Sequence, residues 1–347
     1  MARGDETMRK VNETLHARVD ALMDGAEKRL TFERYQGSAA EWQRELRAAL
    51  VELLAVGYEG APAPVEVINS RDMGNYTRYY IRMTTPDGVI VPAYKLVPNE
   101  LRAPAKAILC LHGHGAGKVI PAGFECDVLG REVQIAGERD YAVQAARNGY
   151  IAISPDMRGF GELMLQDDMN ADRGSSCQQL SQRLLMIGRT VLGMRVHDSM
   201  YWYDYLAGLE EVDPAHIYVT GQSGGGTGTL STAACDPRFS KAAPSCYFCT
   251  FRDSILAMSH CTCNYAPGLL SLCEMYDIAG LIAPRPMLVI AGKEDMIFPI
   301  DGVRRAFEKT QAVYAALGAE ENLELYVGDE GHRYYAARVW DFLEEKG

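Results

Sequence analysis

The fold of this chain is decided by one stretch, Gly221-Gln222-Ser223-Gly224-Gly225-Gly226. The apolar residues 216–220 before it are typical of a buried strand, and the small residues 227–234 after it favour a helix. A serine at such a strand-to-helix turn lies on a sharp bend, and small neighbours let the backbone and the helix approach closely. The pattern predicts a nucleophile elbow, with Ser223 at the carboxyl edge of a parallel sheet.

Two later segments supply the partners that an elbow serine requires. A strand at 287–291 runs into Gly292-Lys293-Glu294-Asp295, so Asp295 lies just beyond the strand end. A further strand at 323–327 leads to His332, which is the only histidine after Asp295. The order serine, acid, histidine matches the α/β-hydrolase order and differs from those of the chymotrypsin and subtilisin folds. We therefore predict a catalytic triad of Ser223, Asp295 and His332.

Other carboxylates compete with Asp295 for the role of the acid. Glu294 is adjacent in sequence, but its side chain should point to the other side if the strand register continues. Asp253, Glu274 and Asp277 lie in the connection after the preceding strand and are weaker alternatives. Asp295 is the preferred acid.

Backbone N–H groups are expected to stabilise the oxyanion of a tetrahedral intermediate. One belongs to Gly224, directly after the nucleophile. The other comes from the loop after the strand at 107–111, where Gly113 and His114 are alternatives and His114, just past the bend, is preferred. His112 and His114 also suggest a metal site, but no further ligand has a suitable spacing nearby.

Composition and charge restrict the class of protein. The 347 residues are 48% hydrophobic and 23% charged, which supports a sizeable core. The net charge of −11 argues against nucleic acid or an anionic membrane as the main partner. Residues 1–10 are polar, and no stretch approaches the roughly 20 apolar residues of a membrane span. We expect a cytoplasmic protein without a signal peptide.

The nine cysteines are expected to be reduced thiols, because their number is odd and the chain shows no leader. Cys246 and Cys249, followed by His260, Cys261 and Cys263, form a competing zinc-binding pattern. Its spacings are tight, and a cysteine on a buried strand behaves as a small hydrophobic residue. Packed free thiols are therefore favoured in the cysteine-rich segment 246–273, and we expect no metal and no cofactor.

The predicted organisation is a helical N-terminal extension, residues 1–60, before an α/β catalytic domain, residues 61–347. The helices of the extension pack either on the domain itself or on a second subunit. The sequence is therefore compatible with a monomer and with a homo-oligomer formed through these helices. The domain is expected to hold a mostly parallel sheet with helices on both faces. Its eight expected strands lie at 79–83, 89–96, 107–111, 150–154, 217–220, 242–247, 287–291 and 323–327.

Three connections, near 113–138, 159–195 and 250–285, are longer than usual βα loops. Such inserts commonly build a substrate pocket or a lid. Three aromatic residues in or near them are expected to wall a short pocket: Phe160, Tyr265 and Phe298. Asp156 and Arg158, after the strand at 150–154, are interpreted as a salt-bridged turn that braces the elbow rather than as an anion site.

Taken together, these motifs resemble the α/β-hydrolase superfamily, in particular its acetyl xylan esterase-like and cephalosporin C deacetylase-like esterases. The resemblance spans about residues 78–335 and rests on segments 112–114, 156–161, 221–226, 282–286, 292–299 and 331–332. It implies an esterase or deacetylase that needs no cofactor and acts on a small-molecule ester through Ser223, Asp295 and His332. The three glycines after Ser223 and the cysteine-rich segment depart from the pattern, so the acyl substrate stays open.

Two alternatives remain at the level of sequence. A peptidase of the prolyl oligopeptidase type uses the same triad, but no propeller domain precedes the predicted core. A non-catalytic binding protein on a hydrolase fold usually lacks a triad member, whereas this chain has all three. The preferred function is the removal of short acyl groups, acetyl above all, from a carbohydrate or a similar polar alcohol.

Overall fold

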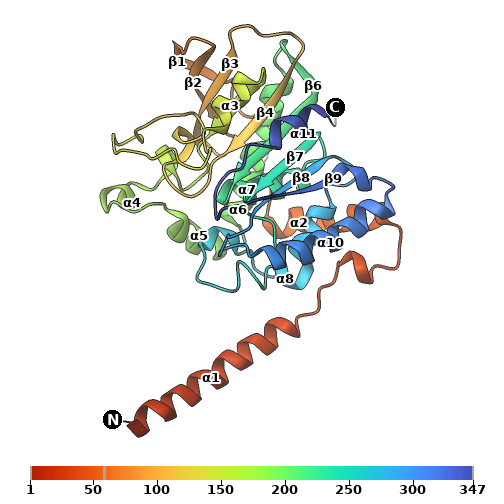
Figure 1. Ribbon diagram of the computed structural model, residues 1–347. Helices are drawn as coiled ribbons and strands as arrows, with labels where there is room; N and C mark the ends of the chain where they lie inside the picture. The colour runs from red at the N-terminus through yellow and green to blue at the C-terminus, as the bar shows by residue number, and fades with distance from the viewer. Residues whose placement is uncertain (1, 58–59, 346–347) are drawn as a thin grey trace.

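The computed structural model describes residues 2–57 and 60–345, and within them nine strands form one sheet (Figure 1). The strand order is β1-β2-β3-β5-β4-β6-β7-β8-β9. Three strands at one edge are antiparallel: β1 (Glu66–Asp72), β2 (Tyr76–Thr84) and β3 (Ile90–Pro98). The other six run parallel: β4 (Ala105–Leu111), β5 (Ile151–Pro155), β6 (Val212–Gln222), β7 (Lys241–Ser245), β8 (Met287–Gly292) and β9 (Leu323–Gly328).

The sheet has one strand more than the eight expected. β1 pairs with β2 alone, from Glu66 opposite Arg82 to Asp72 opposite Thr77, and forms the sheet edge. All seven of its side chains are exposed. Because neither face of β1 is buried, its sequence lacks the apolar pattern by which the other strands were predicted.

Successive residues of the central strands point into two cores, one on each face of the sheet. In β4, Ala107, Leu109 and Leu111 belong to the larger core, whereas Ile108 and Cys110 belong to the smaller one. The larger core is covered by α2 (Ala39–Leu54), α6 (Val191–Ala207), α7 (Gly224–Cys235), α9 (Met275–Gly280) and α10 (Ile300–Ala316). The smaller core is covered by α3 (Tyr141–Arg147) and α11 (Val339–Glu345). The expected helices on both faces are present.

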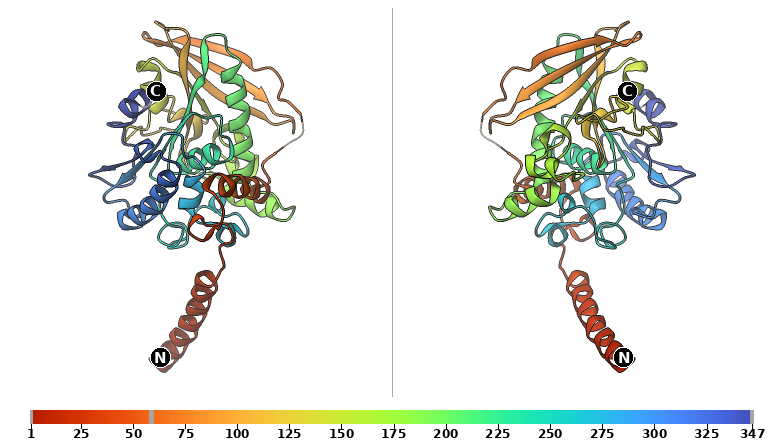
Figure 2. Two further views of the ribbon diagram at one scale, coloured as in Figure 1. Left: turned by 90° about the vertical axis from the view of Figure 1, so that its right-hand side faces the viewer. Right: turned by 90° about the vertical axis from the view of Figure 1, so that its left-hand side faces the viewer.

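The two long helices before the sheet have different environments. α1 (Ala2–Asp24) projects from the body of the molecule (Figures 1 and 2), and its side chains Val11, Leu15, Val19 and Leu22 are 46–63% exposed. In contrast, Trp42 of α2 is fully buried. α2 starts at a capping box formed by Ser38 and Glu41. The sequence predicts one helical extension over residues 1–60. In the structure, α2 lies within this range but packs into the core of the domain.

The turn after β5 is a salt-bridged brace, as expected. Asp156 accepts hydrogen bonds from the backbone N–H and the Nζ of Lys118, both at 2.8 Å, and this pair is fully buried. Arg158 pairs with Asp198 at 2.8 Å and with Asp87. The long inserts around this turn hold the short helices α4 (Gln166–Asn170), α5 (Cys177–Leu185) and α8 (Leu269–Leu272). A bilayer-spanning helix is absent from the described part of the chain, whose helices lack the required length and apolar content.

Candidate active site

Ser223 lies between the last residue of β6 and the first residue of α7, in a backbone conformation of φ 58° and ψ −118°. A non-glycine residue with positive φ is strained and is held by its surroundings. Those surroundings are tight, because a Cβ added to Gly225 would lie 1.9 Å from the carbonyl oxygen of Leu111. The Ser223 N–H also donates to the carbonyl of Ser245 on the neighbouring strand, at 2.9 Å. The sequence Gly-x-Ser-x-Gly therefore forms the sharp bend that was predicted.

Asp295 and His332 form a hydrogen-bonded pair beyond the ends of β8 and β9. Asp295 Oδ2 lies 2.8 Å from His332 Nδ1, and the Asp295 side chain is 1% exposed. Its other oxygen, Oδ1, accepts the backbone N–H groups of Ile297 at 2.9 Å and Phe298 at 3.2 Å. A carboxylate held in this way accepts a hydrogen bond from Nδ1–H of the imidazole, which keeps the proton on Nδ1 and leaves Nε2 as the basic nitrogen.

The rival acids have other positions and partners. Glu294 is exposed, whereas the adjacent Asp295 is buried. Asp253 pairs with Arg305 at 2.7 Å, and Glu274 and Asp277 form the capping box of α9. Asp295 is the acid that the fold brings to His332.

Ser223 and His332 line the same cleft, which has a volume of about 710 Å³. Its wall combines polar and charged side chains with apolar surface. The polar residues include His114, Arg139, Gln222, Glu330 and Arg333, and the apolar ones include Met258 and Ile297. The volume lies within the range of about 300–1,000 Å³ that is usual for small-molecule sites.

His112 orients the loop that follows β4. Its Nε2 accepts the backbone N–H of Met157 at 2.9 Å, so its proton is on Nδ1, which lies 2.7 Å from the carbonyl oxygen of Gly113. Burial lowers the pKa of His112 to about 4, which keeps the ring neutral near pH 7. Because the C=O and N–H of a trans peptide point in opposite directions, the N–H of His114 points away from His112.

The loop after β4 and the start of α7 lie against each other. A Cβ added to Gly224 would lie 3.5 Å from the backbone nitrogen of His114, and one added to Gly113 would lie 3.6 Å from the Cβ of Ser223. Gly224 is also the first residue of α7, where an N–H has no partner within the helix and the helix dipole is positive. The fold thus brings together the three residues expected to form an oxyanion hole.

The three aromatic residues expected to wall the pocket take different places. Phe298 is 1% exposed and stacks on His332, with 5.9 Å between ring centroids. Phe160 is fully buried with its ring 5.2 Å from that of His114. Tyr265 lines a separate cavity of about 70 Å³, and its hydroxyl donates to the carbonyl of Ile255. None of the three is among the residues that line the Ser223 cleft. Phe160 and Phe298 instead pack against the rings of His114 and His332.

The sequence profile of the abhydrolase family matches residues 14–326. The chain belongs to this family. The matched range includes Ser223 and Asp295 but ends within β9, before His332.

Known proteins similar to this abhydrolase include YtaP of Bacillus subtilis (strain 168), which is described as a hydrolase. The two are 28% identical over 244 residues, or 70% of this chain and 77% of YtaP. Among solved structures, a Bacteroides fragilis NCTC 9343 protein described as an acetyl xylan esterase has a TM-score of 0.77 at 20% identity, covering 90% of this chain and 81% of that one. A glucuronoyl esterase from Solibacter usitatus has a TM-score of 0.65 at 15% identity, covering 89% of this chain and 94% of that one. At such identities the structural likeness shows the shared α/β-hydrolase fold.

The cysteines of this abhydrolase are all free thiols, and their arrangement differs from the zinc pattern considered in the sequence. Cys246 Sγ contacts the carbonyl of Arg333 at 3.1 Å, and Cys249 Sγ lies 3.9 Å from the carbonyl of Pro299. Neither belongs to the group formed by His114, Cys177, Cys261 and Cys263, and Cys246 instead lies with Asp295 and His332, with ligand atoms within 4.8 Å of one another. Cys261 and Cys263 belong to the zinc pattern considered in the sequence, but Cys177 lies in a different insert and no spacing links it to them.

Proposed function

We propose that this abhydrolase is a serine carboxylic ester hydrolase. Ser223 is the nucleophile, His332 the general base and Asp295 the group that orients His332. The single observation that carries the proposal is the strained Ser223 in the same cleft as a histidine whose Nδ1 is held by a buried carboxylate. A serine hydroxyl is a weak nucleophile by itself and needs such a base.

In the first half-reaction, Ser223 Oγ attacks the acyl carbon and its proton passes to His332 Nε2. The resulting oxyanion accepts hydrogen bonds from the backbone N–H groups of Gly224 and His114. Collapse of the intermediate breaks the bond to the alcohol, which leaves with the proton from His332. Water then attacks the acyl-serine with His332 again as base, and the acid departs. Asp295 stabilises the imidazolium in both halves.

The proposed substrate is a short acyl ester, most simply an acetyl ester, of a sugar or a similar polar alcohol. The polar and charged side chains of the cleft wall suit an alcohol rich in hydroxyl groups, and the apolar side chains Met258 and Ile297 offer a contact surface for a short acyl group. The description of a structural neighbour as an acetyl xylan esterase agrees with this choice. A series of aryl esters from acetyl to decanoyl tests it, with kcat/KM expected to be highest for acetyl. A maximum at long chains would exclude the deacetylase function.

The reaction class is tested by hydrolysis of an aryl acetate and of a matched aryl amide. We expect the wild-type enzyme to prefer the ester and Ser223→Ala to reduce kcat at least about 10³-fold. Ser240→Ala is the matched control, because Ser240 contacts Ile217 in the middle of β6, away from the carboxyl end that leads to Ser223, and should retain full activity. Activity that survives in Ser223→Ala would exclude this serine mechanism. A preference for the amide would indicate a peptidase.

A further inference from the structure

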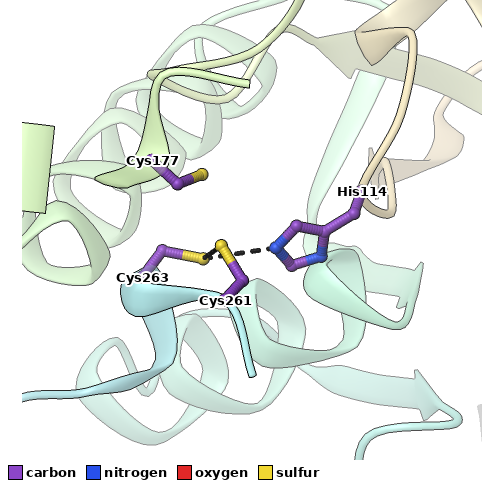
Figure 3. A group of neighbouring side chains, drawn as sticks. All are labelled: His114, Cys177, Cys261 and Cys263. Carbon is purple, nitrogen blue, oxygen red and sulfur yellow. Dashed lines mark hydrogen bonds between the residues drawn. The ribbon is translucent and has the colours of Figure 1, made fainter. Parts of the chain in front are cut away.

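Four side chains with metal-binding atoms meet beside the active-site cleft, and they come from three separate segments (Figure 3). His114 lies in the loop after β4, Cys177 is the first residue of α5, and Cys261 and Cys263 lie in the insert after β7. Their ligand atoms all lie within 4.8 Å of one another. This cluster combines the three long inserts that the sequence places around the site.

The distances within the cluster suit a single tetrahedral ion. Cys263 Sγ lies 3.4 Å from His114 Nε2 and 3.3 Å from Cys261 Sγ. A tetrahedral Zn²⁺ with Zn–S bonds of about 2.3 Å separates neighbouring ligand atoms by roughly 3.6–3.8 Å. A disulfide would instead require two sulfurs at about 2.05 Å. These two separations are close to those that one metal ion would impose, and the remaining ones are at most 4.8 Å.

A buried arginine beside the cluster also fits a metal site with negatively charged thiolate ligands. Arg195 is buried, at 4% exposure, and donates to the carbonyl of Arg158 at 2.6 Å and to Cys177 Sγ at 3.2 Å. A buried guanidinium requires a negative partner, and of these two acceptors the sulfur is the one that can carry charge. Three thiolates and one Zn²⁺ leave a net charge of −1, which Arg195 neutralises.

We propose that His114 Nε2 and the Sγ atoms of Cys177, Cys261 and Cys263 bind one structural Zn²⁺. Sulfur and imidazole nitrogen are the ligands that zinc prefers, and four protein ligands leave no position for a substrate or a reactive water. Binding releases the three thiol protons to solvent as the three Zn–S bonds and one Zn–N bond form. This site revises the expectation, drawn from the sequence, that the chain binds no metal.

The ion would position the oxyanion loop. The ring of His114 lies between the cluster and the elbow, since a Cβ added to Gly224 would lie 2.6 Å from its Nδ1 while its Nε2 faces Cys263. Fixing this ring fixes the residue whose backbone N–H is proposed to meet the oxyanion. Because the ion also binds the cysteines of the other two inserts, it links them to the loop after β4 and holds one wall of the cleft in place.

Metal analysis of the full chain, purified under reducing conditions without chelator, tests the proposal. We expect about one zinc per chain in the wild type and less than about 0.1 in Cys261→Ser combined with Cys263→Ser. Two controls should keep the full zinc content. Cys249→Ser removes a buried thiol of the rival pattern, and Cys126→Ser removes an exposed one.

Cobalt substitution gives a second readout that does not depend on the variants folding. Replacing zinc by Co²⁺ in the wild type should produce thiolate-to-cobalt charge-transfer absorption and intense visible bands of a tetrahedral site. Wild-type protein that carries no zinc and gives no such spectrum would overturn the proposal. A disulfide between Cys177 and Cys261 or Cys263, found by mass spectrometry of the unreduced protein, would overturn it as well.

Discussion

Two groups of side chains face the same cleft, and they are built in opposite ways. Ser223, Asp295 and His332 follow the ends of three parallel strands, β6, β8 and β9. The cysteine cluster, defined as His114, Cys177, Cys261 and Cys263, comes from three loops. The strands hold the triad in place through backbone hydrogen bonds, whereas the loops need a cross-link to hold the cluster. In the proposed mechanism the triad performs the chemistry, and in the proposed metal site the cluster fixes the wall around it.

The largest loss of kcat is expected when the general base, His332, is replaced. His332→Ala removes the group that takes the serine proton, so kcat should fall by about 10⁴–10⁶-fold. His216 offers a matched control, because its Nδ1 also pairs with an aspartate, Asp213, at 2.7 Å, but away from the cleft. His216→Ala should leave kcat within about twofold. Equal losses in the two variants would show that His–Asp pairs act here through stability alone.

The next largest loss of kcat is expected when the acid of the triad, Asp295, is replaced. Asp295→Asn places an amide beside Nδ1, which favours the wrong tautomer of His332 and removes the negative charge. We expect kcat to fall by about 10²–10⁴-fold while KM changes little. Glu294→Gln, one residue away and exposed, should retain activity. A large loss in Glu294→Gln and a small one in Asp295→Asn would assign the acid to Glu294.

Gly224→Ala tests the region where the triad meets the cluster. The added Cβ would lie 2.6 Å from His114 Nδ1, so the ring and its loop must move. Displacing one oxyanion donor should reduce kcat by about 10²–10³-fold. The control is Gly174→Ala, where a Cβ meets no atom within 4 Å. Unchanged kcat in Gly224→Ala would show that His114 does not contribute to the oxyanion hole.

Removal of the metal should have a smaller effect than any change within the triad. Apo-enzyme prepared with a chelator under reducing conditions should lose about 10–100-fold in kcat, because the oxyanion loop is displaced rather than removed. Both Zn²⁺ and Co²⁺ should restore the rate, as expected for an ion that does not touch the substrate. If the Co²⁺ and Zn²⁺ enzymes differed strongly in kcat at full occupancy, the ion would take part in the chemistry.

The smallest effect on activity is expected from deletion of residues 1–24. We propose that α1 mediates self-association, because Val11, Leu15, Val19 and Leu22 are spaced along one face of the helix and are exposed. Its ion pairs with the body, Arg252 to Asp20 and Asp24, are solvent-exposed and should contribute little. The truncated protein should keep kcat within about twofold and show a lower mass in solution by light scattering. An unchanged mass would refute self-association through α1, whereas aggregation would mean that α1 completes the subunit's own core.

The fold and the positions of Ser223, Asp295 and His332 beyond strand ends could be predicted from the sequence, because periodic burial marks strands. The pattern failed at β1, where all side chains are exposed. The prediction that Phe160, Tyr265 and Phe298 wall the pocket was wrong, since a residue's place in or near a long insert does not follow from its distance to a strand. The cysteine cluster could not be predicted for the same reason, because Cys177 and Cys261 meet only through the paths of two separate inserts.

Labelling with a fluorophosphonate probe, followed by peptide mass spectrometry, tests directly whether Ser223 is the nucleophile, since such probes react with an activated serine. The wild-type protein should be labelled once per chain, on Ser223, with loss of ester hydrolysis in proportion to labelling. Labelling should be absent in Ser223→Ala and strongly slowed in His332→Ala. The proposed mechanism would be contradicted by folded wild-type protein that hydrolyses an aryl acetate while Ser223 stays unlabelled. A label on another serine would contradict it as well.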